Sequence, residues 1–176
     1  MVHLQVTEIS QEIPRLVRDL MTVGVETCSP DAKISDIAQT FLVKDIDDLV
    51  VLSSGNAIGV IGREDLLRAF TRDDYEFLTA SDILRYGVPQ VPPDIPIRAA
   101  AQIMLDQGIQ TLFLMHHAAG IEYPAACISL YHLLRFIAAR GESDLKDLGI
   151  HAERRSPLEI FVERREAARR SASRVK

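Results

Sequence analysis

The sequence is poor in aromatic residues and in cysteine. Its 176 residues include no Trp, four Tyr and six Phe. Aromatic side chains on which nucleic-acid bases could stack are therefore scarce, which argues against binding of single strands. The two cysteines, Cys28 and Cys127, form neither a paired-cysteine metal motif nor a disulfide framework. Two unpaired thiols favour a reducing compartment, so we expect a cytoplasmic protein.

Long apolar runs and known catalytic motifs are also missing. No apolar run approaches the ~20 residues that a membrane-spanning helix needs. The first ten residues lack the basic and then apolar order of a signal peptide. We therefore expect no membrane span and no secretory leader. No Gly-x-Ser-x-Gly turn, phosphate-loop lysine or pair of catalytic carboxylates is present, so we predict that the chain is not an enzyme.

Charge is unevenly distributed along the chain. The formal net charge is −5, but residues 151–176 contain eight basic and four acidic residues, a net charge of +4. The remaining 150 residues are therefore strongly acidic, with a net charge of −9. An acidic body argues against contact with a phosphate backbone. The basic tail suits an acidic protein partner, nucleic acid or the acidic body of a second copy.

The dominant feature of the sequence is an internal repeat. The segment Val17–Leu52 aligns without gaps with Ala80–Met115, 63 residues later, and from Val60 the alignment resumes at an offset of 67. A repeat identifies the folding unit. A single copy of roughly 55 residues would be marginally stable alone. We therefore expect the two copies to pack together about a pseudo-twofold axis, with a crevice for a ligand between them.

Hydrophobic spacing predicts the same mixed α/β (α+β) pattern in both copies. Each copy opens with a short helical turn and continues as strand, helix, strand, strand, helix. In the first copy these are Ile13–Met21, Thr27–Ser29, Ile34–Lys44, Leu49–Leu52, Ala57–Ile61 and Arg63–Phe70. In the second copy they are Ala80–Leu84, Pro89–Pro93, a helix from Pro96 to Gln107, Leu112–Met115, Ala125–Ile128 and Ser129–Ala139.

These elements suggest four parts of the chain: a lead-in at 1–16, a first repeat at 17–72, a second repeat with its linker at 73–140, and a tail at 141–176. The tail is predicted to contain a basic helix from Pro157 to about Arg170, capped by Ser156. A long turn is expected at His116–Tyr123. We expect no metal site at the adjacent His116 and His117, because on a strand they would point to opposite faces.

The order of these motifs resembles a cystathionine-β-synthase-type (CBS) domain. The first copy runs V-R-D-L-M, E-T-C-S-P-D, an amphipathic helix, and D-D-L-V-V-L-S-S-G-N-A-I-G-V-I-G-R-E-D-L-L-R-A-F. The second runs from S-D-I-L through P-P-D-I-P-I to A-C-I-S-L-Y-H-L-L-R-F. Together they resemble a CBS pair, or Bateman module. The resemblance implies a regulatory, non-enzymatic homodimer that binds AMP, ATP or S-adenosylmethionine between its repeats.

The resemblance also points to site residues. In the family, the Asp of a Gly-hydrophobic-hydrophobic-Ser/Thr-x-x-Asp stretch accepts hydrogen bonds from ribose hydroxyls, and the Ser/Thr and helix-start amides face a phosphate. The first copy keeps Asp65 but has Gly62 at the hydroxyl position, followed by Arg63. The second copy keeps Ser129 but has His132 at the Asp position. The first copy is thus the better expected ribose site.

By the same resemblance, four further residues would flank an adenine ring. Thr27 and Cys28 would lie on the first strand, and Asp48 and Val51 would lie across the crevice. Two carboxylates beside Arg63 favour a ligand of low negative charge, AMP or S-adenosylmethionine, over ATP.

A purely structural role for these residues stays open. Acidic residues in a first helical turn are favoured by the helix dipole, and Ser129 is an ordinary helix cap. The alternative function is a ligand-free dimeric scaffold that acts through its basic C-terminal helix. Its partner would be an acidic protein, or nucleic acid, which we disfavour.

Overall fold

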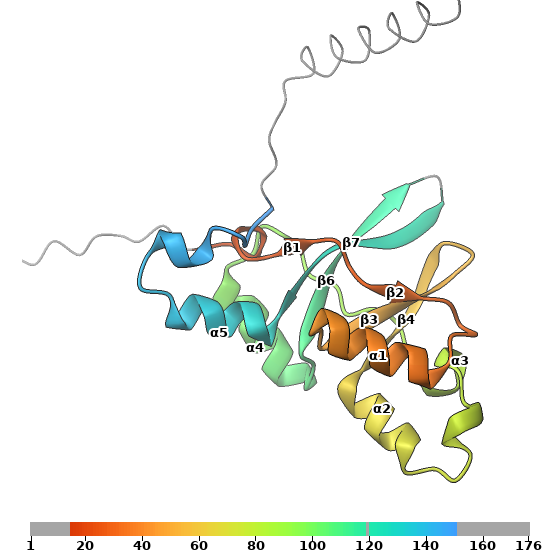
Figure 1. The fold of residues 1–176 in the computed structure, drawn as a ribbon. Coiled ribbons are helices and arrows are strands. Elements are labelled where there is room, and N and C mark those ends of the chain that lie inside the picture. The colour runs from red at the N-terminus through yellow and green to blue at the C-terminus, as the bar shows by residue number, and fades with distance from the viewer. Residues whose placement is uncertain (1–14, 119, 151–176) are drawn as a thin grey trace, which may run out of the picture.

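The computed structural model describes residues 15–118 and 120–150, which form two β-sheets with helices packed against them (Figure 1). The mixed α/β class is therefore confirmed. The first half contains η1 (Val17–Asp19), β1 (Thr22–Val23), β2 (Thr27–Cys28), α1 (Ile34–Lys44), β3 (Asp48–Ser53), β4 (Asn56–Gly62) and α2 (Arg63–Phe70). The second contains η2 (Tyr75–Phe77), α3 (Ala80–Ile83), β5 (Arg85–Tyr86), α4 (Ile97–Gln107), β6 (Thr111–Ala118), β7 (Ile121–Ser129), α5 (Leu130–Ala138) and η3 (Glu142–Leu145).

The two repeats exchange their opening strands. One sheet has the order β2-β3-β4-β5 and the other β1-β7-β6. Strand β5 opens the second repeat but pairs with β4 of the first, and β1 opens the first repeat but pairs with β7 of the second. Each sheet is therefore completed by a segment from the other repeat. Separation of the repeats would break both of these pairings.

Smaller contacts follow the same pseudo-twofold relation. Isolated bridges join Leu16 to Pro96 and Lys33 to Thr79, which are equivalent pairs under the 63-residue offset. The Leu16 amide donates to Asp19 Oδ2 at 2.8 Å, and the equivalent Thr79 amide donates to Asp82 Oδ2 at 2.7 Å. The repetition of these contacts shows that the repeat in the sequence is a repeat in three dimensions.

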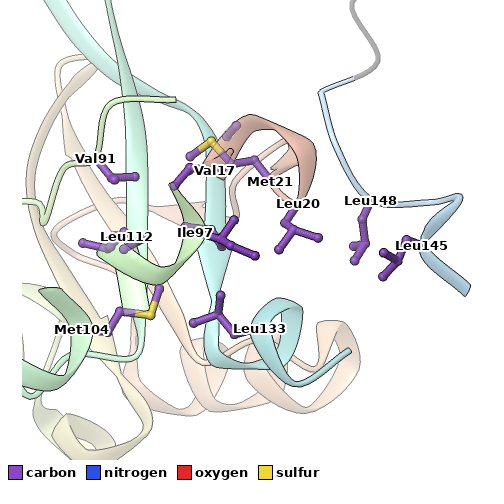
Figure 2. Packing of buried hydrophobic residues seen from close by; sticks show 13 residues of the cluster. Val17, Leu20, Met21, Val91, Ile97, Met104, Leu112, Leu133, Leu145 and Leu148 are labelled. Carbon is purple, nitrogen blue, oxygen red and sulfur yellow. The ribbon is translucent and has the colours of Figure 1, made fainter. Parts of the chain in front are cut away.

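The hydrophobic cores also mix the two repeats. Figure 2 shows the larger core, in which the opening turn of the first repeat packs among residues of the second. Val17, Leu20 and Met21 are completely buried there, and burial of such a side chain contributes about 1.5–3 kcal/mol. The second core is the counterpart, with Ala80 of the second repeat packed among Ile37, Phe41, Leu49, Val51 and Ile61.

A third, smaller core lies between the sheets. Val50 on β3, Val60 on β4 and Phe113 on β6 are buried together. Two glycines with positive φ, Gly24 at 92° and Gly87 at 86°, follow the exchanged strands at equivalent positions. Left-handed backbone is readily adopted by glycine. They turn each opening segment back toward its own repeat.

The second hairpin differs from the prediction. Strands β6 and β7 extend to Ala118 and Ile121, so His116 and His117 lie on a strand and the predicted long turn at His116–Tyr123 is wrong. The polar residues at this tip do not show the apolar pattern by which a strand is predicted, although they pair across the hairpin.

The predicted extended segment at Pro89–Pro93 forms only one isolated bridge, from Gln90 to Phe113. The predicted C-terminal helix and the start of the predicted opening helix lie outside the described residues.

Candidate functional site

The first candidate site begins where β5 of the second repeat meets β4 of the first. Gly59 permits this approach, because a Cβ atom there would lie 2.3 Å from the Arg85 carbonyl oxygen and 2.5 Å from Leu84 Cδ1. No real Cβ atom tolerates such distances, so any larger residue would force the strands apart. Gly59 is also the glycine that opens the family-like stretch ending at Asp65.

Asp65 is buried in the first turn of α2, with only 5% of its surface exposed. Its Oδ2 atom accepts a hydrogen bond from the Gly62 amide at 2.8 Å and another from Arg85 Nε at 2.9 Å. Its Oδ1 atom lies 3.4 Å from Nη1 of the largely exposed Arg68. The position at the helix start favours the carboxylate, and both of its oxygens already have partners in the chain.

Asp48 is the second carboxylate of this site. Its side chain is 8% exposed and accepts a hydrogen bond from Arg85 Nη2 at 2.9 Å. Burial raises the pKa of Asp48, while nearby Thr111 and Arg85 act in the opposite direction. A Cβ atom on Gly62 would lie 2.7 Å from Asp48 Oδ1 and 3.0 Å from Arg85 Nη2. The absence of a side chain at Gly62 therefore makes room for the Asp48–Arg85 ion pair.

The equivalent site in the second repeat is uncharged. The Ser129 amide donates to Nδ1 of the buried His132 at 2.9 Å. Burial, and then the neighbouring Arg135, lower the pKa of His132. The imidazole is therefore neutral at neutral pH, with its proton on Nε2 because Nδ1 accepts. Nε2 then donates to Thr22 Oγ1 on β1 at 3.4 Å.

A buried hydroxyl lies close to the first site. Thr111 is 4% exposed, and it occupies in the second repeat the position of Asp48 in the first. It lies near enough to lower the pKa of Asp48. Its Oγ1 nevertheless has no hydrogen-bond partner of good geometry among the described residues. A buried unpaired hydroxyl is costly and marks a place where a polar group would be accommodated.

Three of the residues predicted to flank an adenine ring lie on the neighbouring strands β2 and β3. Thr27 and Cys28 pair with Val50 and Val51 as neighbours in one parallel ladder, so they do not face Val51 across a crevice. Val51 is completely buried in the core beneath α1. The sequence does not give this register between β2 and β3, and the adenine-flanking role of these residues stays a prediction.

Arg63, another predicted site residue, is the first residue of α2, and its side chain contacts the loop between α1 and β3. Its Nε atom donates to the Ile46 carbonyl at 3.0 Å, and its guanidinium pairs with Asp45 and Asp47. The Arg63 guanidinium is therefore already paired with the loop between α1 and β3.

Two residues of the site were absent from the prediction. Arg85 and Thr22 stand at equivalent positions, 63 residues apart, and reach Asp65 and His132 respectively. The repeat alignment pairs them, but it gives no sign that the opening strands are exchanged. Once the exchange is known, both contacts follow from the pairing of β5 with β4 and of β1 with β7.

The surroundings of the two cysteine thiols disfavour the thiolate form, which is the nucleophile. Burial, and then Asp31, raise the pKa of Cys28 to about 11, and burial also raises the pKa of Cys127. Both thiols stay protonated at neutral pH, and a thiol attacks poorly in that form.

Three further features are relevant to function at the described residues: a metal-binding cluster, a membrane-spanning helix and a cavity. Within residues 15–118 and 120–150, no group of three or more His, Cys, Asp or Glu side chains is arranged to hold a metal ion. In the same ranges, no helix has the length and hydropathy required to cross a bilayer. A cavity of about 230 Å³ lies between η1 and η3, lined by residues such as Arg18 and Leu148, and contains none of the predicted site residues.

Comparison with known proteins gives a family match for the first repeat and a fold match for the pair of repeats. Residues 17–72 match the family model of the CBS domain. No curated protein matches the sequence. Among solved structures, the CBS domain pair of protein MJ0100 in complex with 5′-methylthioadenosine and S-adenosyl-L-methionine is similar with a TM-score of 0.63 and 17% identity, covering 71% of this chain and 97% of that one.

Two further structures have the same fold. A putative acetoin utilization protein (AcuB) from Vibrio cholerae has a TM-score of 0.59 and 17% identity, covering 72% of this chain and 92% of its own. CBSX2 in complex with AMP has a TM-score of 0.57 and 17% identity, with coverages of 70% and 96%. Since each alignment spans nearly the whole of the other chain, the similarity extends over both repeats.

Proposed function

This chain contains a CBS domain at residues 17–72 and has the fold of a CBS-domain pair, and from this premise we propose that it is a regulatory module that binds an adenosine-containing ligand between its repeats. Two similar structures are complexes with such ligands, 5′-methylthioadenosine with S-adenosyl-L-methionine in one and AMP in the other. The observation that carries the proposal is the buried Asp65 at the start of α2, joined to the second repeat by Arg85.

The same geometry supplies a route from binding to signalling. Asp65 belongs to the first repeat and Arg85 to the exchanged strand of the second. A ligand that takes over the Asp65 carboxylate loosens a contact between the repeats. Such a change transmits a signal only if the ligand binds the loosened state more tightly than the closed one. The repeats would then alter their relative angle and present a changed surface to a protein partner.

Thermal unfolding in the presence of AMP, ADP, ATP or S-adenosylmethionine tests the proposal. At 100 times Kd a ligand that binds only the folded state stabilises it by about 2.7 kcal/mol. We expect at least one adenosine compound to raise the Tm, and Asp65→Asn to remove the increase. Asp74→Asn, in an exposed ion pair with Arg72, is the matched control. No shift with any compound would refute adenosine binding.

We further propose that the module is a homodimer. Equivalent positions in the two repeats expose large apolar side chains on α1, α2, α4 and α5, the helices that Figure 1 shows along one side of the strands. These side chains are 64–82% exposed. Large exposed apolar side chains repeated on neighbouring helices are typical of a protein–protein interface. The residues are Leu42 and Leu105, Leu67 and Leu134, and Phe70 and Ile137.

Light scattering after size exclusion tests the dimer. We expect twice the chain mass of 19.6 kDa for the wild type and the single mass for the double variant Leu67→Glu, Leu134→Glu. Val23→Glu, which changes an exposed residue on β1, should leave the dimer intact. A ligand-free scaffold remains the alternative: it predicts this same dimer with no thermal shift by any adenosine compound.

A further inference from the structure

Arg85 neutralises two buried carboxylates at once. Its Nε atom is 2.9 Å from Asp65 Oδ2, and its Nη2 atom is 2.9 Å from Asp48 Oδ1. The two carboxylates are 6% and 8% exposed, whereas the Arg85 side chain is 41% exposed. The guanidinium therefore reaches from solvent into a site whose acidic groups are fixed by the fold. Arg85 is the most exposed of the three side chains.

The buried carboxylates limit what can replace Arg85. Among the described residues, loss of Arg85 would leave Asp65 with only its 3.4 Å ion pair to the largely exposed Arg68. It would also remove the ion pair of Asp48 with Arg85. Breaking a buried ion pair in this way is strongly unfavourable, because it leaves a buried charge poorly compensated. A ribose hydroxyl can donate a hydrogen bond to Asp65, but it supplies no positive charge for Asp48. A phosphate group would add negative charge to the same place. A ligand that displaces Arg85 therefore gains most when it carries a cation of its own.

A second observation is a poorly paired buried hydroxyl beside Asp48. The Thr111 hydroxyl is 4% exposed and lies close enough to Asp48 to lower the pKa of that carboxyl, but it has no hydrogen-bond partner of good geometry among the residues that the structure describes. It comes from the second repeat, whereas Asp48 comes from the first. An incoming polar group beside Asp48 would satisfy this hydroxyl.

The other repeat provides an internal comparison. The positions equivalent to Asp48, Asp65 and Arg85 are Thr111, His132 and Thr22, all uncharged at neutral pH. The backbone arrangement is the same, but only the first repeat has buried carboxylates at these positions that need a cation to neutralise them. The charge preference is therefore a property of three side chains and not of the fold.

We propose that Arg85 is the specificity-determining residue of the first site, and that this site takes an adenosine ligand with a positively charged group in exchange for the guanidinium. The inference rests on the proposed function and adds the charge class of its ligand. A sulfonium beside the ribose, as in S-adenosylmethionine, meets this requirement. Nucleotides with phosphate groups do not.

Calorimetric titration with two nearly identical probes tests the charge requirement. S-adenosylmethionine and S-adenosylhomocysteine differ by one methyl group and hence by the sulfonium charge. We expect the wild type to bind the first at least ~10-fold more tightly, a difference of about 1.4 kcal/mol. AMP should bind more weakly than S-adenosylmethionine. Asp48→Asn should reduce the preference for the sulfonium to about 3-fold or less.

Variants of Arg85 test the exchange itself. Arg85→Gln removes the internal competitor, so S-adenosylmethionine should bind about 10-fold more tightly to it than to the wild type. Arg85→Lys keeps a cation in place, and its affinity should stay near that of the wild type. Arg72→Gln, in an exposed ion pair with Asp74, is the control. Thermal unfolding confirms that each variant is folded before titration.

The outcomes separate this inference from the function on which it rests. If AMP or S-adenosylhomocysteine binds the wild type as tightly as S-adenosylmethionine, and Asp65→Asn abolishes that binding, the charge preference is overturned and the adenosine site stands. An unchanged sulfonium preference in Asp48→Asn, or weaker S-adenosylmethionine binding in folded Arg85→Gln, also overturns it. If no adenosine compound binds any variant, both proposals fall.

Discussion

Thr22 and Arg85 occupy equivalent positions 63 residues apart, and each contacts the first turn of the last helix of the opposite repeat. Arg85 Nε lies 2.9 Å from Asp65 Oδ2, and Thr22 Oγ1 lies 3.4 Å from His132 Nε2. One contact is an ion pair and the other is neutral. A single backbone arrangement thus carries two sites of different chemistry, which respond differently to substitution and to pH.

Replacement of Arg85 by Ala should destabilise the folded protein. The variant leaves Asp48 and Asp65 buried without their shared cation. Since Arg85 is partly exposed, we expect a loss somewhat below the ~3–5 kcal/mol of a fully buried broken pair, about 2–3 kcal/mol at pH 7. Urea unfolding monitored by circular dichroism measures it. Arg72→Ala, which breaks an exposed pair, should cost less than about 1 kcal/mol. Equal losses would contradict a special role for Arg85.

Asp48 should make stability decrease as pH rises. Its folded pKa is raised above the unfolded value of 3.8, mainly by burial, so the folded state holds its proton more tightly. The stability that this proton contributes is fully present below pH 3.8 and is lost as pH rises through the folded pKa. Asp47, Asp65, Arg85 and Thr111 are the groups around it.

Asp48→Asn isolates this contribution, because it removes the titration and leaves the other acids in place. The free energy of unfolding of this variant, minus that of the wild type, should rise with pH from pH 3.8 upward and then level off. Urea unfolding at half-unit pH intervals measures the difference. A difference that is flat across this window would show that Asp48 titrates normally.

The fold could be predicted from the repeat because the spacing of buried apolar residues is visible within each short segment of the sequence. Ile37 and Ala100, or Leu49 and Leu112, are buried at equivalent positions that the 63-residue offset already pairs. The site was less accessible to prediction because it depends on long-range register. Arg85 follows a helical turn in the sequence, and only the pairing of β5 with β4 brings it to Asp65. The burial of Val51 likewise follows from which face of β3 meets α1.

His132 should make stability fall as conditions become mildly acidic. Its folded pKa is lowered from the ordinary 6.5, mainly by burial, so the folded state binds fewer protons than the unfolded one. Its contribution is present above pH 6.5 and is lost as pH falls through 6.5 toward the folded pKa. Asn at this position can still accept from the Ser129 amide and does not titrate. The Tm of His132→Asn should therefore vary less between pH 7.5 and pH 5 than that of the wild type.

The exposed His117 provides the control for this measurement, since its side chain is 68% exposed and lies at the hairpin tip. His117→Asn should keep the pH dependence of the wild type. A wild-type Tm that is unchanged from pH 7.5 to pH 5, or an equal effect of the two substitutions, would contradict the burial of a neutral imidazole.

Gly59→Ala should disrupt the exchange of opening strands. The new Cβ atom would lie 2.3 Å from the Arg85 carbonyl oxygen, which belongs to the backbone and cannot rotate away. Strand β5 must shift, at a cost of about 1–3 kcal/mol or more, and Arg85 moves with it. We therefore expect a lower Tm together with weaker ligand discrimination at the first site. Gly141→Ala is the matched control, because its nearest contact is Ser143 Oγ at 4.0 Å. If both variants unfold like the wild type, β5 does not lie against Gly59.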